Sequence, residues 1–174
     1  LYERCPVRIV MENDAKCAAM AEAAVGSLKD VEDGFVLIFG TMIGGAFIKN
    51  RRLHRGRHFA AGEVSYINTG RAEMPTFSNV WGNRCGTSGL CRMYAQKKRL
   101  APESVDGIMV FEGVKRQEAD AMECLQRFTK EIAVQLFNIQ TILDPERFAI
   151  GGGISAQPVF IEYIKNNLAE LYAG

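Results

Sequence analysis

Apolar and polar positions along the chain alternate between strand-like runs and helix-like patterns. Largely apolar runs at residues 7–11, 35–39 and 148–150 are bounded by polar or glycine residues, as expected for buried strands. Between residues 117 and 143 the apolar positions recur at spacings of three and four, which predicts a long helix stopped by Asp144 and Pro145. Further helices are expected at residues 15–25, 84–100 and 158–171, and further strands at 46–48 and within the basic segment 51–58.

This order of elements predicts the α/β class, with a mixed sheet flanked by helices in one domain. A Rossmann domain is disfavoured because the glycines at 40–45 lie between two strands. They lack the spacing that precedes a helix in dinucleotide-binding domains, and they lack the Walker lysine.

Composition favours a globular protein with small soluble ligands. The chain has 174 residues, 48% of them apolar and 24% charged, and a net charge of +1 with no basic cluster suited to nucleic acid or a membrane surface. The five cysteines form no CxxC pair and indicate reduced thiols in a cytoplasmic protein, and no apolar run approaches the roughly 20 residues that span a bilayer. The chain begins with Leu1 rather than Met, so we expect part of a longer protein.

A carboxylate and an amide occur together where the first predicted strand meets the first helix. Asn13 and Asp14 follow Glu12 at this junction, where a substrate hydroxyl can meet a general base, as in kinases and hydrolases. The alternative is that Asp14 only caps the helix.

Two glycine-rich turns are candidate anion sites, because glycine lets backbone N–H groups approach phosphate oxygens closely. The first contains Gly40, Thr41, Gly44 and Gly45, and the second contains Gly151, Gly152 and Gly153 at a strand-to-helix turn where a nucleotide could rest. In each case the alternative is that glycine only permits a tight turn or close packing.

Two further groups of residues are weighed as ligands. Glu63 follows small residues and could accept hydrogen bonds from the hydroxyls of a polar ligand, or it could simply be solvated. Zinc, for which Cys85, Cys91, His54 and His58 are the candidate ligands, is disfavoured because no two cysteines have the two-to-four-residue spacing of structural zinc sites.

Several of these motifs, taken in order, resemble the ROK family of sugar kinases and sugar-responsive repressors. The resemblance rests on the strings Glu12-Asn13-Asp14-Ala15, Gly40-Thr41-Met42-Ile43-Gly44-Gly45, Ala61-Gly62-Glu63, Cys85-Gly86-Thr87-Ser88-Gly89, Leu143-Asp144-Pro145-Glu146 and Ile150-Gly151-Gly152-Gly153-Ile154-Ser155. It covers essentially the whole chain and implies the actin-like, ribonuclease-H-like fold.

The resemblance implies an ATP- and Mg²⁺-dependent kinase that phosphorylates a hydroxyl of a hexose or N-acetylhexosamine. Asp14 would take the proton from the sugar hydroxyl, and Asn13 and Glu63 would hold other hydroxyls. The glycine hairpin would bind phosphates and residues 151–153 would face the adenosine. ROK proteins are often dimers, so a homodimer is an expectation. The alternative is the sugar-binding effector lobe of a ROK-type repressor.

The chain departs from the family pattern in four places. Ser65 and Tyr66 replace a Gly-His pair, only Cys85 remains of three zinc-binding cysteines, Arg92 stands where a sugar-binding acid often lies, and Met42 replaces a hairpin glycine. We therefore expect a zinc-free branch with altered sugar contacts. The N-terminal lobe, with its Asp-x-Gly-Gly-Thr phosphate motif, has no counterpart here, so residues 1–174 are expected to be a C-terminal lobe with little or no activity alone.

Overall fold

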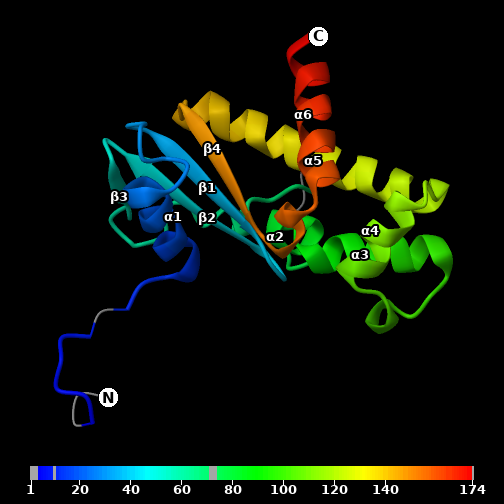
Figure 1. Ribbon diagram of the computed structural model, residues 1–174, viewed down its shortest axis with the longest axis horizontal. Coiled ribbons are helices and arrows are strands. Elements are labelled where there is room, and N and C mark those ends of the chain that lie inside the picture. The colour runs from blue at the N-terminus through cyan, green and yellow to red at the C-terminus, as the bar shows by residue number, and fades with distance from the viewer. Residues whose placement is uncertain (1–3, 10, 71–73, 174) are drawn as a thin grey trace.

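A four-stranded mixed sheet forms the centre of the computed structural model, which describes residues 4–9, 11–70 and 74–173 (Figure 1). The strands lie in the order β3-β2-β1-β4. Strand β1 runs antiparallel to β2 and parallel to β4. The strands are β1 (Gly34–Phe39), β2 (Ile43–Lys49), β3 (Arg52–His54) and β4 (Arg147–Gly152).

Helices flank both faces of this sheet. They are α1 (Asp14–Val25), α2 (Trp81–Cys85), α3 (Thr87–Lys98), α4 (Gly107–Lys115), α5 (Ala119–Leu143) and α6 (Pro158–Ala173). Three short 3-10 turns are η1 (Val64–Tyr66), η2 (Pro102–Ser104) and η3 (Gly153–Ala156). No helix in the described ranges has both the length and the apolar content needed to cross a membrane.

The two faces of the sheet pack against different helices because successive strand residues point in opposite directions. Leu37 belongs to the larger core, which also contains Phe128 of α5 and Phe160 of α6. Its neighbour Val36 belongs to a smaller core, which contains Ala19 of α1. The sheet therefore separates α1 from α5 and α6.

The predicted α/β class, with a mixed sheet flanked by helices, is confirmed. The strands expected at 35–39, 46–48 and 148–150 are present, and the basic segment contains the short strand β3. The helices expected at 15–25, 117–143 and 158–171 correspond to α1, α5 and α6.

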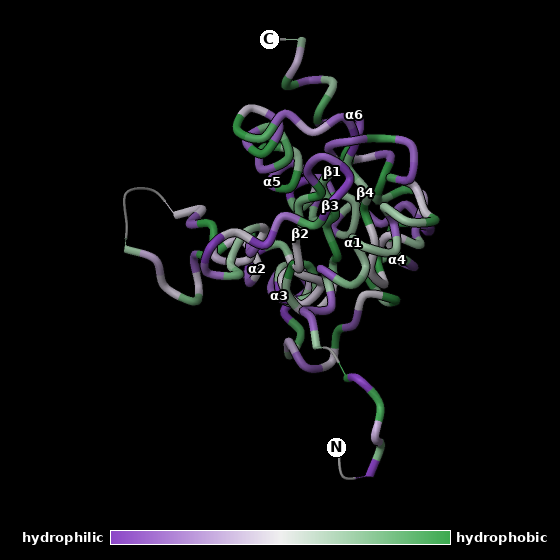
Figure 2. Tube along the Cα trace, turned by 90° about the vertical axis from the view of Figure 1, so that its left-hand side faces the viewer, coloured by the Kyte–Doolittle hydropathy of each residue, from purple (hydrophilic) through white to green (hydrophobic). Residues whose placement is uncertain are grey.

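The strand predicted at residues 7–11 is wrong for the part of that run that the structure describes. Val7, Ile9 and Met11 are 58%, 45% and 89% exposed, and none of them lies in a strand. Residue 10 lies outside the described residues. A strand needs a neighbour to pair with its backbone groups, and none of the four strands pairs with the described part of this segment. The segment instead stands away from the rest of the chain in both views (Figures 1 and 2).

The single helix predicted at residues 84–100 is two helices. Helix α2 ends at Cys85 and α3 begins at Thr87, with Gly86 in an extended conformation between them. A Cβ at Gly86 would overlap the carbonyl oxygen of Thr41 and lie 2.7 Å from that of Gly82. Glycine is therefore needed here for close packing against the β1–β2 turn.

Helix α4 was not predicted from the sequence. Its side chains Val110, Phe111 and Val114 are buried. The Asp106 carboxylate caps its first turn by accepting a hydrogen bond from the Met109 N–H at 2.8 Å. A nine-residue helix with an internal glycine offers too few periodic positions to be recognised.

Candidate functional site

Two cavities meet at the turn between β1 and β2. The first, which we call the acidic cavity, has a volume of about 490 Å³ and is lined by Asp14 and Glu63. The second, the large cavity, has a volume of about 820 Å³ and lies beside α3 and α4. Gly40 and Thr41 line both cavities. The two cavities therefore share Gly40 and Thr41 as a common part of their walls.

Asp14 reaches the acidic cavity from the first turn of α1. Asn13 is the residue that caps this helix, and its side-chain oxygen accepts a hydrogen bond from the Lys16 N–H at 3.2 Å. The Asp14 Oδ1 accepts from the N–H of Ala15 at 2.8 Å, and the residue is exposed. Because Asn13 fills the capping position, the Asp14 carboxylate lines the cavity at the positive end of the helix.

Glu12 lies beside this pair and is held by an arginine. Its Oε2 accepts a hydrogen bond from Arg55 Nε at 2.7 Å. This bond, with a second from the Asn13 N–H, holds the pKa of the Glu12 carboxyl below its usual range. Glu12 is therefore an ionised partner of the loop after β3 rather than part of the cavity wall.

Glu63 lies in the loop before η1 and lines the acidic cavity together with the start of α1. The sequence left open whether this side chain is only solvated. It is instead 32% exposed, and its Oε1 accepts a hydrogen bond from Lys16 Nζ at 3.2 Å. The structure thus brings together Asn13, Asp14 and Glu63 around one cavity.

Ser65 and Tyr66 complete this wall of the acidic cavity. The Ser65 hydroxyl is buried and donates to the carbonyl oxygen of Ile43, which fixes η1 against β2. Tyr66 is 72% exposed and offers a phenol ring to the cavity. Met42, also in the wall, is absent from the residues with positive φ, so its replacement of a glycine introduces no backbone strain.

The β1–β2 turn is shorter than the glycine pattern suggested. It spans residues 40–42, because Gly44 and Gly45 lie within β2 and pair with Ile38 and Leu37 of β1. A Cβ at Gly44 would lie 2.7 Å from the Cβ of Ala15. One at Gly45 would overlap the carbonyl oxygen of Gly62. These two glycines let α1 and the Glu63 loop approach opposite faces of β2.

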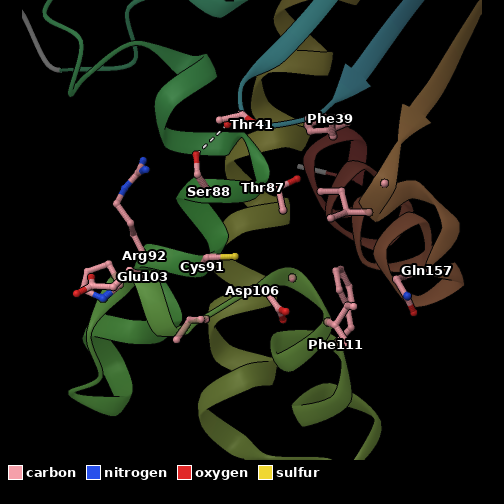
Figure 3. Close-up of a pocket in the computed structure, with 17 residues that line it drawn as sticks. Phe39, Thr41, Thr87, Ser88, Cys91, Arg92, Glu103, Asp106, Phe111 and Gln157 are labelled. Carbon is pink, nitrogen blue, oxygen red and sulfur yellow. Dashed lines mark hydrogen bonds between the residues drawn. The ribbon is translucent and has the colours of Figure 1, made fainter.

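The first turn of α3 is joined to the β1–β2 turn. The N–H of Thr87 donates to the carbonyl oxygen of Gly40 at 2.8 Å. The Ser88 hydroxyl donates to that of Thr41, also at 2.8 Å (Figure 3). These bonds fix the carbonyl oxygens of the turn toward α3.

The large cavity has an apolar wall and a few polar groups. Figure 3 shows Thr87, Cys91, Asp106 and Phe111 around one space, with Gln157 at its far side. Burial raises the pKa of the Cys91 thiol, so this cysteine is expected to remain protonated. An apolar surface with a few polar groups suits a flat, partly polar ligand.

Of the second glycine turn, only Gly153 lines the large cavity. A Cβ there would meet no atom within 4 Å, so space is left for a ligand. Gly152 has φ +97° and packs against the backbone of Phe39. Gly151 lies against the side chain of Ile38. Gly151 and Gly152 therefore serve the packing of β4 on β1.

Residues 83–92, where the family resemblance would place a zinc loop, are held by other interactions. Arg84 makes two hydrogen bonds to Glu131 of α5, at 2.7 and 3.1 Å. Arg92 donates to the side chain of Asn83 at 3.0 Å. Cys85 is buried, and this burial raises the pKa of its thiol. Across the described ranges, no three His, Cys, Asp or Glu side chains are grouped to hold a metal ion.

Sequence reasoning missed most of the large cavity. Asp106 and Phe111 were not singled out, because they belong to the cap and the body of the unrecognised helix α4. The one available signal was Asp106-Gly107 before an apolar segment, which is typical of a helix N-terminus.

The comparison with known families agrees with this geometry. The sequence profile of the ROK family matches residues 1–173. The chain belongs to the ROK family. Its resemblance to that family at the level of short motifs thus extends to the whole described domain.

Relatives and solved structures add detail to this assignment. The chain is 32% identical over 161 residues to a β-glucoside kinase of Listeria monocytogenes, covering 92% of this chain and 55% of that protein. A ROK family protein of Streptococcus pneumoniae, solved in complex with sucrose, matches with a TM-score of 0.86 and 30% identity over 98% of this chain and 58% of that one.

A ROK family glucokinase of Streptomyces griseus, solved with glucose and AMPPNP, matches with a TM-score of 0.89 over 99% of this chain and 61% of that one. Its identity of 21% supports the shared fold alone. The chain spans little more than half the length of each of these proteins.

Proposed function

We propose that the whole protein containing this chain transfers the γ-phosphoryl group of ATP to a hydroxyl of a hexose, an N-acetylhexosamine or a β-glucoside. The sugar binds in the acidic cavity and the nucleotide in the large cavity. The observation that carries the proposal is that Gly40 and Thr41 line both cavities, with Asp14 in the same wall. The β-glucoside kinase of Listeria and the sucrose-bound protein of Streptococcus support the class of substrate.

Asp14 acts as the general base in this reaction. The sugar oxygen attacks the γ-phosphorus, the bond from this phosphorus to the β–γ bridging oxygen breaks, and the hydroxyl proton passes to the Asp14 carboxylate while ADP leaves. Asn13 and Glu63 hold neighbouring hydroxyls and so fix the attacking oxygen. Such positioning of the nucleophile supplies much of the rate enhancement in phosphoryl transfer.

In this proposal the phosphates of ATP lie against the β1–β2 turn, and the adenosine lies along the apolar wall of the large cavity near Phe111 and Gly153. A Mg²⁺ ion would be held chiefly by the phosphate oxygens, since the described residues contain no group of three metal ligands. It would neutralise charge on the phosphates.

Replacing the proposed base tests this assignment. In the whole protein, Asp14→Asn removes the proton acceptor but keeps the side-chain shape, so kcat should fall about 10²- to 10⁴-fold with little change in sugar affinity. A coupled assay of ADP release and calorimetric titration with sugar measure the two quantities. Asp120→Asn, at a partly exposed position on α5, is the matched control. Unchanged turnover in Asp14→Asn would remove Asp14 from this role.

A sugar-responsive repressor is the second candidate. Tyr66 favours it, because this exposed ring lines the acidic cavity where many kinases of the family carry a histidine. Sugar binding by the whole protein without any ADP release in the same assay would support the repressor and exclude the kinase.

We also propose that this chain is the C-terminal lobe of the enzyme. Its span of 55% of the Listeria kinase supports this, as does the absence of an Asp-x-Gly-Gly-Thr motif from its sequence. The 174-residue chain alone should therefore release ADP poorly or not at all.

A further inference from the structure

Lys16 is a buried lysine for which the proposed reaction has no role. It lies on α1, two residues after Asp14, and only 2% of its surface is exposed. A lysine is seldom fully buried unless its ammonium group is paired. Here the ammonium has two acceptors, the carbonyl oxygen of Phe59 at 2.5 Å and the Glu63 Oε1 at 3.2 Å.

Both acceptors belong to the loop that carries Glu63. Phe59 and Gly62 have positive φ angles of 59° and 84°, so the backbone turns at the first acceptor and again immediately before the second. A non-glycine residue such as Phe59 adopts this conformation only when surrounding contacts hold it. The bond from Lys16 to the Phe59 carbonyl is one such contact.

The link joins two segments that each contribute residues to the wall of the acidic cavity. Strand β3 pairs with residues 47–49 of β2, so α1 and the Glu63 loop meet beside the other half of β2, around Gly44 and Gly45. One ammonium group thus joins the segment that carries the proposed base to the segment that carries the proposed sugar ligand.

We propose that Lys16 is a positioning residue for sugar binding. It orients the Glu63 carboxylate by donating a hydrogen bond to Oε1, which leaves Oε2 for a sugar hydroxyl. It also fixes the Glu63 loop relative to Asp14. This inference rests on the proposed function, since it assigns Lys16 to the same sugar site.

The proposal predicts a selective effect on the sugar. Lys16→Met keeps the unbranched shape and most of the length of the buried side chain and removes the ammonium group. Glu63 then has no cation beside it and its loop loses one attachment. Breaking one side of a buried charge pair weakens binding strongly, but Glu63 is about one third exposed, which reduces the effect. We expect the KM and Kd for sugar to rise about 10-fold, with the KM for ATP within about twofold of the unaltered protein.

The experiment uses the whole protein with methyl β-glucoside, glucose and N-acetylglucosamine as probes. Lys115→Met is the matched control, because Lys115 forms an exposed ion pair with Glu112 on α4. A selective rise in sugar KM in Lys16→Met, absent from Lys115→Met, supports the proposal. A uniform fall in kcat with unchanged KM values would show only a loss of folded protein, and it would overturn the positioning role, as would no change at all.

A double-mutant cycle keeps the test decisive if Lys16→Met folds poorly. Lys16→Met combined with Glu63→Gln contains no unpaired charge at this site, so it should fold. In the Glu63→Gln background, removing the Lys16 ammonium should alter sugar Kd by clearly less than the roughly 10-fold seen in the unaltered background, because the carboxylate that it orients is gone and only the bond to the Phe59 carbonyl is lost. A full 10-fold effect in that background would refute the proposal. If the unaltered protein binds none of the three sugars, the proposed function itself fails, which is a distinct result.

Discussion

Replacing the adjacent glycines of β2 with alanine should disturb the two sides of the acidic cavity separately. A Cβ at Gly44 would lie 2.7 Å from the Cβ of Ala15, next to Asp14. One at Gly45 would overlap the Gly62 carbonyl oxygen and lie 2.7 Å from Val64 Cγ2, next to Glu63. Neither neighbour is the flexible end of a long side chain, so α1 or the loop must move.

The magnitude follows from two opposing contributions. Overpacking of this kind costs about 1–3 kcal/mol of stability. Alanine regains roughly 0.5–1 kcal/mol over glycine within a strand, because glycine loses more backbone freedom on folding. Overpacking is the larger contribution, and each variant should be destabilised by about 1–2 kcal/mol.

Urea unfolding and steady-state kinetics of the whole protein measure these effects. We expect Gly44→Ala to lower kcat, because it displaces Asp14, and Gly45→Ala to raise the KM for sugar, because it displaces Glu63. Gly40→Ala is the control for stability, since the nearest atom to its Cβ is 3.8 Å away. If Gly44→Ala and Gly45→Ala are both as stable as Gly40→Ala and have unaltered kinetics, β2 does not set the distance between Asp14 and Glu63.

Three further predictions concern the large cavity and the core. Gly153→Ala should keep the stability of the protein, since its Cβ has open space, and should raise the KM for ATP; an unchanged KM would separate Gly153 from the nucleotide. Cys91 should react with a thiol reagent more slowly than exposed Cys17, and slower still with AMPPNP bound; equal rates with and without nucleotide, by mass spectrometry, would exclude this cavity as the nucleotide site. Phe160→Ala should cost about 3–5 kcal/mol in urea unfolding, because this ring is fully buried and packs edge-on against Phe39; a cost below about 1 kcal/mol would contradict the described core.

Much of the fold could be predicted because its strands and long helices have clear periods. The apolar residues 35–39 are buried between two helical layers, and α5 shows its buried face in the spacing of its apolar side chains. The segment at residues 7–11 is also largely apolar. Whether such a segment forms a strand depends on a neighbouring strand to pair with, which the local sequence does not reveal.

The candidate site was predictable to a smaller extent. Asp14 and Glu63 are far apart in sequence, and a family resemblance was needed to associate them before the structure placed both on one cavity. The glycine pattern did not distinguish Gly40, which faces the cavities, from Gly45, which permits close packing. Only the atoms that surround each glycine in the folded structure make that distinction. The pairing of Lys16 with Glu63 likewise became visible only in the structure.

The hydrogen bonds from Thr87 and Ser88 connect α3 to the β1–β2 turn, which lies between the proposed sugar site and the proposed nucleotide site. If a sugar shifts the turn, the start of α3 moves with it and reshapes the neighbouring space where the nucleotide is proposed to lie. Thermodynamic linkage then requires the two ligands to alter each other's affinity by the same factor, whichever binds first. We expect sugar binding alone to slow amide hydrogen exchange in the first turn of α3. This slowing would show the coupling between the two sites without any phosphoryl transfer.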